Sequence, residues 1–132
     1  MISAYFERYG AVQRYMQEAV EDARLHAAAT TLLGRRRPLL EVNSSNRGKQ
    51  AAAERLAVNT PIQGTAADII KLAMVRLHQR LKAEGLKAQL LLTVHDELVL
   101  EAPEAEAERV AELTREAMEG AMSLSVPLRV DL

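Results

Sequence analysis

An apolar run broken by three polar residues decides the fold of this chain: Leu90-Leu91-Leu92-Thr93-Val94-His95-Asp96-Glu97-Leu98-Val99-Leu100. Residues that favour strands flank the break on both sides, which predicts two strands joined by a short turn. That turn carries an imidazole and two carboxylates. Carboxylate oxygens suit a hard divalent cation such as magnesium, so the turn predicts metal-dependent chemistry with Asp96 and Glu97 as candidate ligands.

The composition is that of a single globular domain with an aliphatic core. Of the 132 residues, 48% are hydrophobic and only 3% are aromatic, so Leu, Ala, Val, Ile and Met build the interior. The absence of Cys excludes disulfides and thiolate metal sites. No signal peptide and no run approaching ~20 apolar residues is visible, so we expect a cytoplasmic protein that does not cross a membrane.

The charges are unevenly distributed although the net charge is only −1. Residues 34–55 contain six basic side chains and two acids, whereas residues 101–120 contain seven acids and two arginines. A basic middle can attract a polyanion. Two solvated surfaces explain the same pattern equally well, so charge alone does not identify a partner.

Hydrophobic periodicity predicts a mostly helical chain with a small sheet. We expect helices at 3–25, 46–59, 60–84 and 103–120, an irregular loop at 30–45, the two strands around the turn, and a short strand at 127–131. Thr60 fits an N-cap, Pro61 the first helical position, and Gln63 the partner in a capping box. The predicted fold class is therefore α+β, with helices packed on a small antiparallel sheet.

Apolar residues at helical spacing indicate which faces of the helices are buried. One serine of the pair at 44–45 is the expected cap of the helix at 46–59. The helix at 3–25 repeats apolar residues at Tyr5, Tyr9, Val12, Met16, Ala19, Val20 and Ala23. The helix at 60–84 has a stripe at Ile62, Ala66, Ile69, Ile70, Ala73, Leu77 and Leu81.

Two strings of the sequence together carry a resemblance to a known family. Residues 55–68 read Arg-Leu-Ala-Val-Asn-Thr-Pro-Ile-Gln-Gly-Thr-Ala-Ala-Asp, and Val94-His95-Asp96-Glu97 follows after about thirty residues. With residues 5–9 and 33–37, these strings resemble the C-terminal part of a family A DNA polymerase, the bacterial DNA polymerase I type. The similarity covers nearly the whole chain.

The resemblance implies a role for each matched position. Asp96 would bind the catalytic magnesium ions, Glu97 would support that site, and His95 would steady the primer terminus. The residues that would touch primer-template DNA near the newest base pair are Arg55, Asn59 and Gln63. The chain would be one partial domain, with a fingers-to-palm helix and loop at 1–45 and a palm segment at 46–132.

The implied DNA contacts are physically reasonable for an enzyme that must accept every sequence. Purine N3 and pyrimidine O2 acceptors occupy similar places in the minor groove, so donors such as Arg55 and Gln63 can test pair geometry without reading sequence. Arg55 and Asn59 are four residues apart and share a helix face. Gln63 lies beyond Pro61, so we expect it to join them only through a bend between two helices.

The sequence also departs from the family pattern. It contains no counterpart of the family's other metal-binding aspartate, nor of the fingers helix that grips the incoming triphosphate. We therefore expect that the chain does not polymerise alone, that dNTP binding belongs to the complete enzyme, and that a partner chain can supply the missing palm motif. Within the matched region, Ala27 and Ala28 replace a typical Gly-aromatic pair.

The sequence leaves other functions open. Adjacent His95 and Asp96 also suit a metal-dependent phosphohydrolase, but such an enzyme needs further His ligands, and only His26 and His78 are available. A second alternative is a non-catalytic DNA-binding or interaction module that needs a partner chain. Arg55 can be an ordinary surface arginine and Gln63 a simple capping residue.

Overall fold

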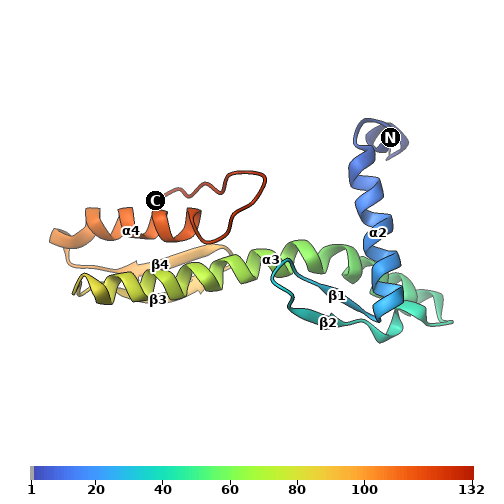
Figure 1. Cartoon of the computed structure of the whole chain (residues 1–132), viewed down its shortest axis with the longest axis horizontal. Coiled ribbons are helices and arrows are strands. Elements are labelled where there is room, and N and C mark those ends of the chain that lie inside the picture. The colour runs from blue at the N-terminus through green and yellow to red at the C-terminus, as the bar shows by residue number, and fades with distance from the viewer. Residues whose placement is uncertain (1) are drawn as a thin grey trace. The chain divides into compact units, whose positions relative to one another are not determined.

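The computed structural model of the protein describes residues 2–132, with side chains from residue 4 onward. These residues form two compact units, which divide between Thr65 and Ala66 (Figure 1). Helices dominate both units, and each unit contains one two-stranded antiparallel sheet, which confirms the predicted α+β class. None of the described helices combines the length and apolar character needed to cross a membrane.

The first unit packs α2 and the start of α3 around a small hairpin. Its elements are α1 (Ile2–Arg8), α2 (Gly10–His26), β1 (Ala28–Thr30), β2 (Arg36–Pro38), the 3-10 helix η1 (Leu40–Asn43) and the first part of α3 (Arg47–Ala83). The strands pair from Ala28 with Pro38 to Thr30 with Arg36. The core consists of Ala23, Ala29, Leu39, Val42, Ala53 and Ala57.

The β1–β2 hairpin and η1 correct the expected irregular loop at 30–45. β2 is fully exposed and consists of two arginines and a proline, so no hydrophobic alternation marks it in the sequence. In β1, by contrast, Ala28 and Ala29 are buried.

The predicted helix at 3–25 is present but divided. Tyr9 separates α1 from α2 with φ −118° and ψ 52°, next to the helix-weakening Gly10. α2 ends at Ala27, whose φ of 50° places it in the left-handed region. That conformation favours glycine.

The predicted break at Thr60–Pro61 is wrong, because α3 runs unbroken from Arg47 to Ala83 with Pro61 inside it. A proline in a helix removes one backbone hydrogen bond and crowds the preceding turn. Here the hydroxyl of Tyr15 donates to the Val58 carbonyl in that turn at 2.8 Å. The Thr60 hydroxyl has no hydrogen-bond partner within the described residues, so Thr60 is not a cap.

Two further details of α3 differ from expectation. The cap of its N-terminus is Asn46, not a serine: its side-chain oxygen accepts from the backbone N–H groups of Gly48 and Lys49 at 3.0 and 3.2 Å. Ile62 and Ala66, expected on the buried stripe, are exposed. The stripe was predicted for a helix that starts at residue 60, whereas α3 is continuous from Arg47.

The second unit packs the β3–β4 hairpin against α4 and the remainder of α3. It contains β3 (Gln89–Val94), β4 (Glu97–Glu101), the 3-10 helix η2 (Glu104–Glu106) and α4 (Ala107–Glu119). The hairpin is confirmed, with Val94 paired to Glu97 across the turn and a register shift between Leu90 and Leu92. The core is formed by Leu77, Leu81, Ala88, Val110, Leu113 and Ala117, with Leu90, Leu98 and Leu100 packed against it.

The ends of the helices in this unit follow the sequence closely, but the last strand does not form. α3 ends at Ala83, one residue before the predicted end at 84, and Gly85 follows with φ 67°. The predicted strand at 127–131 is wrong, because residues 127–132 have no regular structure. The tail is held instead by a hydrogen bond from the Val130 backbone N–H to the Glu119 carboxylate at 3.1 Å.

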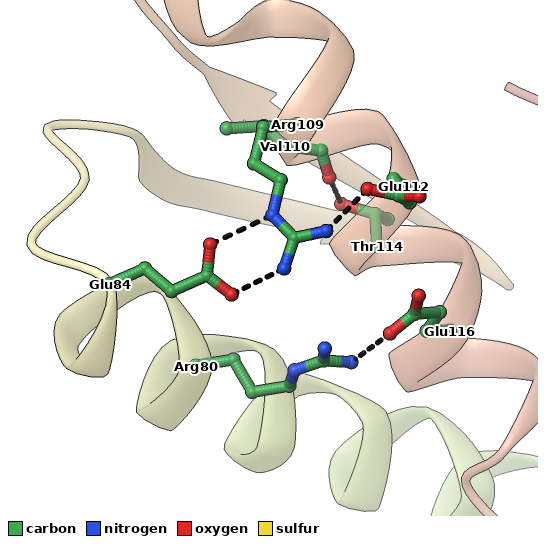
Figure 2. A network of polar contacts seen from close by, with 7 residues as sticks. All are labelled: Arg80, Glu84, Arg109, Val110, Glu112, Thr114 and Glu116. Atoms are coloured by element: carbon green, nitrogen blue, oxygen red, sulfur yellow. Dashed lines mark hydrogen bonds and ion pairs between the residues drawn. The ribbon is translucent and has the colours of Figure 1, made fainter.

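Ion pairs on the surface tie α4 to the C-terminal part of α3 (Figure 2). Arg109 grips the Glu84 carboxylate with two nitrogens, at 2.8 and 2.6 Å, and also contacts Glu112. Arg80 pairs with Glu116 at 2.5 Å. The hydrogen bond from Arg109 lowers the pKa of Glu84 and the same contacts raise the pKa of Arg109, so the charged forms of both are favoured.

Candidate active site and nucleic-acid interface

The turn of the β3–β4 hairpin presents the three predicted residues together. β3 ends at Val94 and β4 begins at Glu97, so His95 and Asp96 form a two-residue loop. His95 has a φ of 55°, which the favoured two-residue hairpin turns require at their first position. All three side chains are exposed. Few non-glycine residues adopt this conformation, and such residues are often found at functional sites.

The two acids of the turn line a hollow of about 550 Å³ together with the C-terminal tail. Arg129 and Asp131 of the tail contribute a cation and a further carboxylate to its lining. Sequence analysis did not select either residue. The sequence indicated only a short strand at 127–131. The structure shows that these residues lie beside the hairpin.

The chemistry of the turn suits part of a magnesium site. Asp96 and Glu97 offer exposed carboxylate oxygens on a short, hydrogen-bonded hairpin, and Mg²⁺ is commonly bound through one or two carboxylates plus water and substrate phosphates. Within residues 2–132 no group of three His, Cys, Asp or Glu side chains is placed to hold a metal ion. The donor type therefore fits, and the turn supplies only part of the ligand set.

The three predicted DNA-contact residues lie on a single helix. Because α3 is continuous, Arg55, Asn59 and Gln63 stand at positions i, i+4 and i+8, which places them along one face. The expected bend between two helices is not needed. All three are exposed, and their side chains make no hydrogen bond or ion pair with other described residues. We call these three residues the α3 row.

Two contacts from α2 anchor the helix beside Arg55 and Asn59 of the α3 row. Tyr15 donates to Val58 beside Asn59, and burial raises the pKa of that phenol, which stays a donor at neutral pH. Arg24 of α2 pairs with Glu54 beside Arg55 at 2.6 Å. These contacts fix the helix while leaving the donors of the row unused.

The basic middle of the sequence divides into two groups. Three of its side chains already bond within the protein: Arg35 to the Gly64 carbonyl, Arg36 to the His26 carbonyl and Lys49 to Glu41. Arg37, Arg47 and Arg55 are exposed and have no such partner in the described part of the chain. The positive surface available to a polyanion is therefore smaller than the sequence suggests.

Comparisons with known proteins give matches over nearly the whole length of the chain. A sequence profile of DNA polymerase family A matches residues 1–132. The DNA polymerase I of Bacillus caldotenax is 55% identical over 130 residues, which is 98% of this chain and 15% of the relative. The thermostable DNA polymerase I of Thermus thermophilus is 50% identical over 131 residues, 99% of this chain and 16% of the relative.

One solved structure matches the fold closely. It is the polymerase domain of Pol1 from M. smegmatis in complex with a DNA primer-template and dNTP, with a TM-score of 0.95 and 48% identity. The match covers 97% of this chain and 23% of that chain. The present chain thus spans less than a quarter of the solved domain, and about one sixth of the curated relatives.

Proposed function

Because the chain belongs to DNA polymerase family A, we propose that it forms part of the palm of a DNA-directed DNA polymerase and binds primer-template DNA through the α3 row. The observation that carries this proposal is the row itself: three exposed donors without internal partners among the described residues, spaced on one face of a helix. Donors of this kind can contact minor-groove acceptors that are common to all base pairs. The segment 1–45 would link fingers to palm, and 46–132 would be the palm segment.

The β3–β4 turn would form the catalytic part of the site. Asp96 would hold the catalytic magnesium, Glu97 would support it, and His95 would steady the primer end. When bound, magnesium stabilises the attacking and leaving oxygens of phosphoryl transfer. The hairpin fixes the backbone of Asp96, so the carboxylate needs little further ordering to meet a cation. The dNTP would be bound by the complete enzyme.

DNA binding by the α3 row is tested with the isolated chain. Fluorescence anisotropy of a labelled primer-template at low salt should show binding that weakens as salt rises. Protein binding releases cations condensed on the DNA phosphates, and added salt opposes that release. Arg55→Ala should weaken binding about fivefold or more, because a donor to the minor groove is lost. Lys71→Ala removes an equally exposed charge from α3 outside the row and should change binding less than about twofold. Equal losses would contradict the proposal.

Catalysis by the turn is tested in a complete polymerase. The 132 residues would replace the matching segment of the B. caldotenax enzyme, and Asp96→Asn should then reduce primer extension by on the order of a hundredfold or more. Glu101→Gln, at the far end of β4, is the control and should leave extension nearly unchanged. Full extension by the Asp96→Asn chimera would exclude this role.

We also propose that the chain alone does not extend a primer, because it spans only 15% of the B. caldotenax relative and 23% of the solved polymerase domain. A primer-extension assay on the isolated chain tests this directly. If the isolated chain extended the primer and Asp96→Ala abolished that extension, the 132 residues would be sufficient for polymerisation. In that case no partner chain with a further palm motif would be required.

A further inference from the structure

The turn of α3 that carries Asn59 is bonded to α2. The Tyr15 hydroxyl donates to the backbone carbonyl of Val58, the residue directly before Asn59, at 2.8 Å. The two helices pack together here, since Ala23 of α2 lies in one core cluster with Ala57 of α3. The Asn59 side chain is exposed and takes no part in this hydrogen bond. Tyr15 thus holds the backbone beside a proposed DNA contact and leaves the contacting side chain unused.

Pro61 removes an internal hydrogen bond from the same turn. It lies inside α3 and has no N–H, so the Ala57 carbonyl lacks the donor that a helix normally supplies four residues further on. The buried Thr60 hydroxyl has no hydrogen-bond partner within the described residues. The contact from Tyr15 to Val58 therefore gives the turn a hydrogen bond from outside α3 where one inside the helix is missing.

The turn that carries Gln63 is bonded to the β1–β2 loop instead. An Arg35 side-chain nitrogen donates to the backbone carbonyl of Gly64, the residue directly after Gln63, at 3.0 Å. The Leu32 backbone N–H donates to the Thr65 hydroxyl, also at 3.0 Å. Gln63 itself is exposed and makes neither contact. The backbone on this side of the proline is therefore held by the hairpin loop and not by α2.

We propose that the α3 row is positioned for DNA in two parts that act separately. Tyr15 is the positioning residue for Asn59. Arg35 is the positioning residue for Gln63, and Pro61 lies between the two parts. A backbone that is already fixed lowers the entropy cost of ordering each side chain on the DNA. This division rests on the proposed function, in which the α3 row binds primer-template DNA.

The contact beside Arg55 is of a different kind. Arg24 pairs with the carboxylate of Glu54 at 2.6 Å, and both side chains are partly exposed. An exposed ion pair contributes little free energy. It also joins two side chains and does not bond to the α3 backbone. We therefore assign no positioning residue to Arg55.

Double-mutant cycles test the division, with dissociation constants measured by fluorescence anisotropy of a labelled primer-template at low salt. Tyr15→Phe removes one hydrogen bond and should weaken binding about threefold in the otherwise unchanged chain. In the Asn59→Ala background the same change should weaken binding less than about 1.5-fold, because the side chain that it orients is gone. In the Gln63→Ala background the loss should remain about threefold.

The second part of the row has the opposite pattern. Arg35→Met removes a hydrogen bond and a charge, and Arg37→Met removes only a charge, since Arg37 is exposed and has no hydrogen-bond partner in the described chain. Arg35→Met should therefore weaken binding about threefold more than Arg37→Met. This excess should disappear in the Gln63→Ala background and persist in the Asn59→Ala background.

The cycles separate positioning from a general loss of structure. A partly unfolded chain binds more weakly by the same factor in every background, so a purely structural role gives no coupling. Tyr9→Phe is the matched control, because it removes an exposed hydroxyl that has no hydrogen bond within the described residues. It should change binding less than about 1.5-fold in each background. A variant that is unfolded as the isolated chain is measured in the chimera with the complete B. caldotenax enzyme, where the same couplings are expected.

Three results would contradict the proposal. Additive losses in both matched pairs, or equal coupling in matched and crossed pairs, would overturn it and leave the α3 row as the DNA interface. Coupling in only one matched pair would overturn the division into two parts. If neither Asn59→Ala nor Gln63→Ala weakened binding, their proposed DNA contacts would fail and both positioning roles would fail with them.

Discussion

The two hairpins of the molecule are held in place by different forces. β1 and β2 have three residues each. Two hydrogen bonds of 3.0 Å bind their loop to α3: the Leu32 backbone N–H donates to the Thr65 hydroxyl, and the Arg35 side chain donates to the Gly64 carbonyl. β3 and β4 have six and five residues, and their leucines pack into an apolar core with α3 and α4. A short strand pair thus depends on polar anchors and close fit, whereas a longer pair is stabilised by apolar burial.

The largest effect should come from removing apolar volume under the β3–β4 hairpin. Leu113→Ala truncates a fully buried side chain of that core and should lower the free energy of unfolding by about 2–5 kcal/mol. Leu91→Ala, at a leucine of β3 that is half exposed, should cost far less. Urea denaturation followed by circular dichroism compares them, and similar losses would show that apolar burial does not hold this hairpin.

The close fit under the β1–β2 hairpin gives the next largest effect. A Cβ at Gly64 would lie 2.6 Å from Cγ2 of Thr31, so Gly64→Ala should destabilise the protein by about 1–3 kcal/mol. Thr31→Ser removes that methyl group and keeps the hydroxyl that accepts from the Arg35 backbone N–H. The double variant should recover much of the loss in urea denaturation, and no recovery would contradict a steric cause.

A smaller, stabilising effect is expected at the start of the first hairpin. Ala27 has a φ of 50°, a conformation that costs an L-residue roughly 1–2 kcal/mol and costs glycine little. Ala27→Gly should therefore raise the thermal midpoint. Ala67→Gly, at an exposed position within α3, should lower the stability by about 1 kcal/mol. If Ala27→Gly lowered the thermal midpoint as Ala67→Gly does, backbone strain at Ala27 would be excluded.

The smallest effect concerns the ion pairs behind the second hairpin. Arg109 depresses the pKa of Glu84 below 4.5, so their interaction stabilises the fold above that pH and is lost as the pH falls through the lowered pKa. The effect is small because both side chains are partly exposed to screening solvent. Glu84→Gln should flatten the decline of the melting temperature below pH 4.5. Glu101→Gln, which removes an acid without an ion-pair partner among the described residues, should leave the decline as it is.

Most of the second unit could be predicted from the sequence because its signals are local. Strand-favouring residues on both sides of His95–Glu97 predict the hairpin, and helical spacing predicts Leu77 and Leu81 on the buried face of α3. The first unit is less predictable. Exposed β2 has no apolar pattern, and its pairing depends on contacts with residues distant in the sequence.

The candidate site shows the same division. The residue types of the turn and of the α3 row, together with the family strings, are sufficient to identify Asp96 and Arg55 as candidates. Their geometry is a tertiary result. Arg129 and Asp131 line the hollow with Asp96, and between them the backbone N–H of Val130 donates to the Glu119 carboxylate.

The sequence by itself determined the family, the α+β class and the hairpin with its acidic turn, since short-range patterns and the motif strings contain that information. Only the tertiary structure decided that Arg55, Asn59 and Gln63 share one helix face. Pro61 predicts a break when read locally. The helix nevertheless continues through Pro61, and in the preceding turn the hydroxyl of Tyr15 donates to the carbonyl of Val58, a contact between residues 43 apart in the sequence.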